Sequence, residues 1–252
     1  MTRESFSRVG GLVVLSLILG ACQTSSLPSP ESLELVDHQL VGPPELEPLI
    51  FQPLQGSQEE VLADHAKERA MALPNQITTV DGRPTISSLG QRGDLVAELV
   101  TASPGPPEQT VRLFRDDEMI FETFAGLPSP VLPLQALWTY DGHWALEILF
   151  ADESTWAGEI FIDADLLNAA KGYDEGFGFQ LLSGKPFFFY VKNDHVGYSF
   201  DGQETDLAYD EIPHYRCCSE SVLNPIQAQN MVAFFAVQDT TWYYVELGAF
   251  AE

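Results

Sequence analysis

The chain has 252 residues, in which 37 aspartates and glutamates outnumber 12 lysines and arginines, so that its formal net charge is −25. A charge of this sign and size repels phosphate groups, which argues against nucleic acid as a partner and against attachment to anionic headgroups through charge. The acidic residues are scattered rather than blocked, which is typical of side chains that keep a protein soluble. A cationic ligand remains compatible with this composition.

The first residues have the organisation of a secretory signal peptide. Arg3 and Arg8 form a basic start, residues 9–19 are apolar, and small residues lead to Cys22. The apolar run is shorter than the roughly 20 residues that a transmembrane helix needs. We therefore predict that residues 1–21 are a signal peptide that is removed on export.

The end of this segment resembles the lipobox of bacterial lipoproteins. In that family the signal is cut before the cysteine, and a diacylglyceryl group is attached to the thiol. The resemblance implies that Cys22 carries the lipid and provides the membrane contact of the protein. Gln23 follows the cysteine, as in lipoproteins sent to the outer membrane, so the resemblance implies a protein of the bacterial cell envelope, at the outer membrane or cell surface.

Two short regions precede the main domain. Residues 22–55 are rich in proline, serine and glutamate and contain few aromatic residues, which predicts a flexible tether. Ser57 and Glu60 then form a capping box, the sequence signature of a helix start. Apolar residues recur at helical spacing up to Pro74, so a short helix is predicted within 56–76.

Residues 77–252 predict an all-β domain. Short apolar runs rich in phenylalanine, tyrosine, tryptophan and valine are separated by glycine, asparagine and aspartate, a pattern typical of strands. Three Asp-Gly pairs lie between candidate strands, and such pairs tolerate the positive φ angles of tight hairpin turns. These pairs are Asp81-Gly82, Asp141-Gly142 and Asp201-Gly202.

An internal similarity indicates a repeated unit within 156–250. Asp163 is followed by Tyr173-Asp174-Glu175, and Asp201 is followed in the same way by Tyr209-Asp210-Glu211. A period of about 40 residues is typical of repeat arrays, because a lone hairpin has nothing against which to bury its apolar face. We expect stacked antiparallel β-hairpins throughout this segment, with Asp163 and Asp201 in equivalent turns.

The acidic residues that recur with the repeat are predicted to hold turns, because a residue repeated by the scaffold normally serves the scaffold, whereas an active site occurs once. They are Asp174, Glu175, Asp210 and Glu211. Three histidines beside turns are predicted to be hydrogen-bonded structural imidazoles rather than catalytic bases. They are His143, His195 and His214. We predict neither a metal nor a cofactor.

Residues 192–212 resemble the bacterial WG β-repeat, whose units run as a Trp-Gly strand, an Asp/Asn-Gly turn and a Tyr-Asp strand end. Val196-Gly197 stands where the family has Trp-Gly, and the preceding unit has Trp156-Ala157-Gly158. The resemblance implies a repetitive β fold with an envelope or surface role and no particular chemistry. Two other all-β architectures remain open, a small β-propeller of about four blades and a β-sandwich.

Motifs for catalysis are missing from the sequence, which has no Gly-x-Ser-x-Gly elbow, no His-Glu-x-x-His and no phosphate loop. We therefore expect a non-catalytic binding or structural module rather than an enzyme. A second hypothesis is a hydrolase or carbohydrate-active enzyme with acidic residues in a cleft lined by Trp138, Trp144 and Trp156. A third is a substrate-binding component of an envelope complex.

The adjacent pair Cys217-Cys218 is a candidate disulfide in an oxidising, exported setting. Adjacent Cα atoms lie about 3.8 Å apart, below the usual disulfide range of about 4.4 to 6.8 Å, so this bridge would be strained. Two reduced thiols in a loop are the alternative. A metal site that adds His214 is disfavoured, because neighbouring side chains of an extended segment point in opposite directions.

Overall fold

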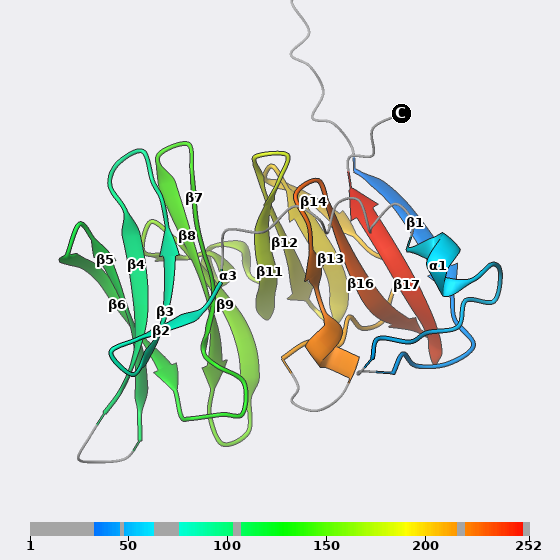
Figure 1. Ribbon diagram of the computed structural model, residues 1–252, viewed down its shortest axis with the longest axis horizontal. Coiled ribbons are helices and arrows are strands. Elements are labelled where there is room, and N and C mark those ends of the chain that lie inside the picture. Colours follow the sequence, from blue (N-terminus) through cyan, green and yellow to red (C-terminus); the bar gives the residue numbers. More distant parts are fainter. Residues whose placement is uncertain (1–32, 46–47, 63–75, 103–106, 216–219, 249–252) are drawn as a thin grey trace, which may run out of the picture. The chain divides into compact units, whose positions relative to one another are not determined.

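The protein has an all-β fold built of antiparallel sheets, as predicted (Figure 1). Two short α-helices lie among the described strands, α1 (Gln58–Val61) and α3 (Leu167–Lys171). No helix in the described part of the chain is long and apolar enough to cross a bilayer. The computed structural model describes residues 33–45, 48–62, 76–102, 107–215 and 220–248.

The first sheet region is a meander in which each strand pairs with its neighbours in the chain. Its strands are β2 (Thr78–Val80), β3 (Arg83–Ser88), β4 (Leu95–Thr101), β5 (Gln109–Arg115) and β6 (Glu118–Gly126). Along β4 the buried side chains Leu95, Ala97 and Leu99 alternate with more exposed ones, because successive side chains of a strand point to opposite faces. This face of the meander supplies part of the core.

Three further groups of antiparallel strands complete the fold. The second group contains β7 (Leu134–Tyr140), β8 (His143–Ala151), β9 (Trp156–Ile162) and β10 (Asp165–Leu166). The third contains β11 (Glu175–Leu182), β12 (Lys185–Lys192), β13 (His195–Phe200) and β14 (Gln203–Asp206). The fourth contains, in spatial order, β1 (Glu34–Gln39), β17 (Thr241–Gly248), β16 (Met231–Gln238) and β15 (Ile226–Gln227).

A single parallel pair joins the meander to the second group. Gly126 of β6 lies opposite Ala151 of β8, and the N–H of Leu127 donates to the carbonyl oxygen of Ala151 at 2.7 Å. A Cβ on residue 126 would lie 1.8 Å from that oxygen, and Gly126 has a φ of +91°. Glycine permits this close approach of two backbones, and an L side chain would obstruct it.

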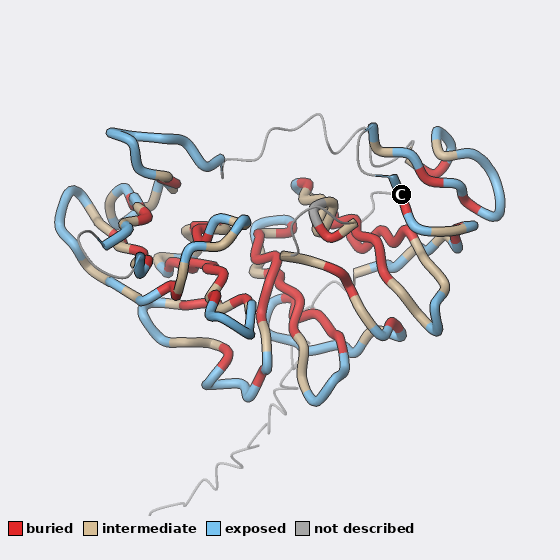
Figure 2. Tube along the Cα trace, turned by 90° about the horizontal axis from the view of Figure 1, so that it is seen from below, coloured by how far each residue is buried: buried red, intermediate tan, exposed pale blue. Residues whose placement is uncertain are grey.

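Apolar cores lie between successive groups of strands, so the groups are stacked. One core joins the meander to β7, β8 and β9, a second joins these strands to β11 and β12, and a third joins β11, β12 and β13 to β16 and β17. In the third core Phe189 packs against Phe234 with ring centroids 4.9 Å apart. Figure 2 shows buried residues running along the strands and exposed residues at the turns.

Two-residue turns connect many of the hairpins. All three Asp-Gly pairs form such turns with positive φ at both residues, between β2 and β3, between β7 and β8, and between β13 and β14. Other turns keep this geometry without glycine at the second position. These are Asp116-Asp117, Asp163-Ala164, Asn193-Asp194 and Asp239-Thr240.

Asp163 and Asp201 occupy equivalent turns of the repeated unit. The N–H of Asp163 donates to the carbonyl oxygen of Trp144 at 3.2 Å, and that of Asp201 donates to the carbonyl oxygen of Pro186 at 2.9 Å. Trp144 and Pro186 are both the second residue of the preceding strand. The two copies therefore share the same hairpin register at this turn.

The prediction of hairpins throughout 156–250 is wrong at α3, which follows β10 in the first copy. Ala169 and Ala170 have high helix propensity. Gly172 ends the helix with a φ of +70°, the left-handed conformation that glycine favours after a helix. The second copy has no α-helix at the corresponding place after β14.

The second copy is also interrupted after Glu211. Glu211 pairs with Val237 of β16, as Glu175 pairs with Val191 of β12. The β11–β12 ladder continues from Glu175, whereas pairing with β16 resumes only at β15. Within this excursion lies the 3₁₀-helix η1 (Glu220–Leu223). The Asn224 side chain replaces part of the missing strand, since it donates to the Phe235 carbonyl oxygen at 2.7 Å and accepts from the Phe235 N–H at 2.8 Å.

The prediction of a flexible tether over 22–55 is wrong for the described part of that segment, because this part contains β1. This strand pairs antiparallel with β17 along its length. Leu40 and Phe51 are buried, and Phe51 stacks on Tyr244 with ring centroids 5.0 Å apart. The prolines of this segment lie outside β1, so they do not obstruct its ladder.

The predicted helix begins at its capping box. The Ser57 hydroxyl accepts the N–H of Glu60 at 3.3 Å, and the Glu60 carboxylate accepts the N–H of Ser57 at 2.8 Å. Val61 of α1 is buried in the core that also contains Leu40 and Phe51. The rest of the predicted helix falls within 63–75, outside the described residues.

Candidate functional site

The cysteines singled out from the sequence lie outside the described residues. Cys22 belongs to the segment 1–32, and Cys217 and Cys218 belong to 216–219. Lipidation of Cys22 and a bridge between the adjacent cysteines therefore stay predictions.

Asp174 and Asp210 have the same role in the two copies of the repeat. The carboxylate of Asp174 accepts the N–H of Asn193 at 2.8 Å, and that of Asp210 accepts the N–H of Asp239 at 2.7 Å. Asn193 and Asp239 are the first residues of the turns that end β12 and β16. These repeated carboxylates are thus engaged in holding the scaffold.

Two of the three histidines have side-chain partners. The Nε2 atom of His214 lies 3.0 Å from the carboxylate of Glu175, which also accepts a backbone N–H at 2.8 Å. The Nδ1 atom of His143 contacts the carboxylate of Asp163. His195 is exposed at the start of β13. Structural hydrogen bonds therefore account for the arrangement of His143 and His214.

The tryptophans of the hydrolase hypothesis do not form the expected cleft. Trp138 and Trp144 are 6 % and 4 % exposed and belong to two different cores. Trp156 is 37 % exposed. Burial of the first two rings removes the aromatic platform on which that hypothesis depends.

Sequence reasoning misses Glu147, a carboxyl buried between β8 and β11. It accepts the N–H of Gly178 at 3.0 Å, the N–H of Phe179 at 2.5 Å and the hydroxyl of Tyr215. The two N–H groups belong to a β-bulge in β11. Burial raises the pKa of Glu147, and the hydrogen bonds only partly oppose this shift. An acidic residue within the apolar run of β8 is the sequence signal that identifies it.

A cavity of about 360 Å³ lies beside this carboxyl, lined in part by Glu147, Tyr215 and Asn224. Three donors already use most of the acceptor capacity of Glu147. The carboxyl therefore joins β8, the bulge of β11 and the Tyr215 segment, and its main role is structural.

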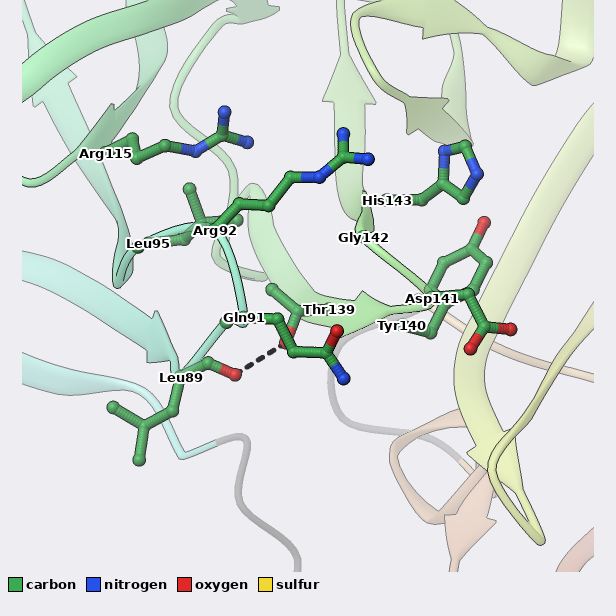
Figure 3. Close-up of a pocket in the computed structure, with 12 residues that line it drawn as sticks. Leu89, Gln91, Arg92, Leu95, Arg115, Thr139, Tyr140, Asp141, Gly142 and His143 are labelled. Atoms are coloured by element: carbon green, nitrogen blue, oxygen red, sulfur yellow. Dashed lines mark hydrogen bonds between the residues drawn. The ribbon is translucent and has the colours of Figure 1, made fainter.

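A second cavity, of about 180 Å³, lies where three connections meet (Figure 3). These are the loop 89–93 between β3 and β4, the end of β5, and the turn between β7 and β8. Its lining includes Arg92, Arg115, Tyr140 and His143. We call it the arginine cavity.

The loop that carries Arg92 is fixed to β7. The Thr139 hydroxyl donates to the carbonyl oxygen of Leu89 at 2.7 Å, the bond drawn in Figure 3. The guanidinium group of Arg92 lies across Gly142, where an added Cβ would be 3.0 Å from its atoms. The missing side chain at residue 142 therefore makes room for this guanidinium group.

Arg92 and Arg115 differ from the other lysines and arginines that the structure describes. Five others form ion pairs with carboxylates at 2.6 to 3.9 Å, namely Arg83, Arg112, Lys171, Lys185 and Lys192. Arg92 and Arg115 form no ion pair with any described residue, and the Nε atom of Arg115 is shielded from solvent without a hydrogen-bond partner. The arginine cavity is therefore a local surplus of positive charge in a chain of net charge −25.

Tyr140 adds a neutral donor to this cavity. Burial, with the nearby carboxylates of Asp163 and Asp141, raises its pKa to about 12, so the phenol stays protonated at neutral pH. In Figure 3 the carboxylate of Asp141 points away from both guanidinium groups. The side chains facing this opening are thus mainly hydrogen-bond donors.

No protein-family model matches this chain, and no curated protein is significantly similar to it in sequence. Among the residues that the structure describes, no group of three or more histidine, cysteine, aspartate or glutamate side chains is placed to hold a metal ion.

Proposed function

We propose that this protein is a lipid-anchored component of the bacterial cell envelope whose stacked β domain is a non-catalytic binding module. The anchor rests on the lipobox-like segment that ends at Cys22. The binding role rests on the arginine cavity, where the two described cations without an ion pair, Arg92 and Arg115, come together. This convergence is the observation that carries the proposal.

The structural hydrogen bonds made by the main carboxylates favour a binding role over a catalytic one. Asp174 and Asp210 hold turns, and Glu147 holds a β-bulge. A catalytic acid or base must reach the proton that it transfers, and carboxylates occupied by backbone donors are poorly placed to do so. The arginine cavity offers donors that suit recognition of a ligand.

The anchor is tested by Cys22→Ser in the full-length chain. The variant has no thiol for the lipid, so we expect it to leave the detergent-extractable membrane fraction and to lack the mass of the diacylglyceryl group. Cys217→Ser is the matched control, because it replaces a cysteine outside the lipobox-like segment. Retention of Cys22→Ser in the membrane with an unchanged mass contradicts the anchor.

The binding role is tested by capture of partners from detergent-solubilised envelope. Wild-type protein should capture a component that Arg92→Gln and Arg115→Gln capture weakly. Arg83→Gln is the control, because Arg83 belongs to the same meander but pairs with Glu98 at 2.9 Å. Equal capture by all four proteins would argue against the arginine cavity as the binding site.

A further inference from the structure

We infer that the arginine cavity binds an oxyanion group, a carboxylate or a phosphate, on the ligand of this protein. The inference rests on the proposed function and adds the chemical class of the ligand. The position of Arg92 and Arg115, the surroundings of their guanidinium groups and the size of the cavity all favour such a group.

The two arginines approach the cavity from different elements. Arg92 comes from the loop between β3 and β4, and Arg115 ends β5, where it pairs with Leu95 of β4. A guanidinium group is planar and presents N–H donors in a fork that matches two oxygens of one carboxylate or phosphate. Figure 3 shows Arg92 between Arg115 and His143, so an oxyanion here meets donors from more than one side.

The surroundings of Arg115 strengthen its attraction for an anion. Its Nε atom is shielded from water and lacks an acceptor among the described residues. Burial of this part of the guanidinium group lowers the local dielectric constant below that of water, which strengthens the interaction with an opposite charge. An oxyanion seated beside this guanidinium group supplies the missing negative charge.

The net charge of the chain does not decide what binds at this cavity. The acidic excess leaves a cationic ligand possible, but exposed charges farther away than about 8 to 10 Å are largely screened at physiological salt. Two guanidinium groups line the cavity, Arg92 and Arg115, against one lining carboxylate, Asp141, which points away from them. The nearby Asp163 carboxylate contacts His143, and that of Asp116 accepts the N–H of Asp94 at 3.1 Å. The local sign therefore favours an anion.

The size of the cavity limits what it encloses. Its volume of about 180 Å³ is below the roughly 300 to 1,000 Å³ of sites that enclose a whole drug-sized ligand. One carboxylate or phosphate group with a few attached atoms suits this space. The rest of a larger ligand would lie outside.

The test uses the full-length lipidated protein in detergent, titrated with inorganic phosphate and, separately, with succinate by calorimetry at low salt. We expect at least one probe to bind, with affinity that falls as salt is added. Arg92→Gln and Arg115→Gln should each weaken binding by about tenfold or more, because each removes charge-assisted hydrogen bonds. Arg83→Gln and Arg112→Gln, in which the lost arginine is already paired with a carboxylate, should bind as wild type.

A glycine pair provides a second test that keeps both arginines. Gly142→Ala places a methyl group 3.0 Å from the Arg92 guanidinium group, whereas Gly82→Ala meets nothing within 4 Å. The two glycines have φ values of +80° and +79°, so both variants carry the same backbone strain. Weaker binding of the probe by Gly142→Ala alone supports a site at Arg92, and equal binding by both variants opposes it.

The outcomes separate this inference from the proposed function. Binding of phosphate without succinate, or the reverse, identifies which oxyanion the site takes. Failure of wild type to bind either probe, or equal weakening by Arg83→Gln and Arg92→Gln, overturns the oxyanion site. If envelope capture still depends on Arg92 in that case, the binding module stands and its ligand is of another class.

Discussion

At the scale of single residues, the carboxylates of this acidic chain fall into two classes, buried ones that accept several hydrogen bonds and exposed ones that accept a single bond from a turn N–H. Glu147 is buried and accepts two N–H groups and a hydroxyl, while Asp174 and Asp210 accept one turn N–H each at the surface. Removing an acceptor costs most where the donor left behind is cut off from water. The two kinds of carboxylate should therefore differ in their effect on stability.

Glu147→Ala is expected to lower the free energy of unfolding by about 2 to 4 kcal/mol, because it leaves the N–H groups of Gly178 and Phe179 buried without an acceptor. Denaturant unfolding of the variant beside wild type measures the change. Glu118→Ala, which removes an exposed glutamate of β6, is the control. Similar stabilities of the two variants would show that Glu147 does not hold the bulge.

The pH dependence associated with Glu147 has a defined sign. Burial raises its pKa in the folded protein above the value in the unfolded chain, so the folded state binds this proton more tightly. The resulting stabilisation is complete below the unfolded pKa, about 4.3, and is lost as the pH rises through the folded pKa. Unfolding measured from pH 4 to pH 7 should show wild type losing stability relative to Glu147→Gln. A difference that stays constant with pH would contradict this assignment.

Asp174→Ala and Asp210→Ala should each destabilise the fold by about 1 kcal/mol, because each removes one hydrogen bond to a turn N–H. The asparagine variants keep an acceptor oxygen and should lose less. The two sites lie in different copies, so the double alanine variant should show the sum of the single effects in thermal or denaturant unfolding. Unequal single effects would mean that the copies are not energetically equivalent.

At the scale of elements, the hairpins follow local sequence, and the parallel pair that joins the meander to the second group depends on one glycine. Gly126→Ala should lower the free energy of unfolding by about 3 kcal/mol or more, since it adds a clash with the Ala151 carbonyl group to the strain of a positive φ. Gly184→Ala has a φ of +80° and open space around it, so it isolates the strain. Equal losses in the two variants would show that the bridge tolerates a side chain.

The sequence correctly predicts those features that depend only on residues adjacent in the chain. The turn at Asp141-Gly142 and the capping box at Ser57 each need only a few adjacent positions. β1 escapes prediction because its partner, β17, lies at the other end of the chain and the region around β1 is rich in proline. Local patterns of composition therefore overstate how flexible this segment is.

The arginine cavity cannot be predicted from spacing, because Arg92, Arg115 and His143 come from three separate connections. No motif links them along the chain. The only sequence signal is that lysine and arginine are few in a strongly acidic chain. A cation without an ion pair is therefore informative once its position in the structure is known. Glu147 is different, because an acidic residue in the apolar run of β8 is visible in the sequence.

At the scale of the whole molecule, the fourth group of strands joins residues from opposite ends of the described chain. Glu34 lies opposite Gly248, and the Tyr209 hydroxyl donates to the Asp37 carboxylate at 2.9 Å. Burial and this hydrogen bond raise the pKa of Tyr209. The first described strand is thus an integral part of the last sheet.

A double-mutant cycle of Asp37→Ala and Tyr209→Phe tests this docking. Because the two side chains share one hydrogen bond, their combined effect on unfolding should be smaller than the sum by about 0.5 to 1.5 kcal/mol. Amide hydrogen exchange should show protection in β1, because its backbone pairs with β17. If the two substitutions had strictly additive effects on the free energy of unfolding and the β1 amides exchanged without protection, the prediction of a flexible segment would be supported instead.

The pairing of β1 with β17 also sets an order of events during biogenesis. A chain synthesised from its amino end presents β1 early, yet the strand that pairs with it, β17, is the last in the described sequence. Until β17 arrives, β1 has unpaired backbone groups that can pair with other chains. Contacts between such distant residues also form slowly. A premature stop before β17 would therefore leave β1 without its partner in the same molecule, so loss of this late strand would expose the first described strand.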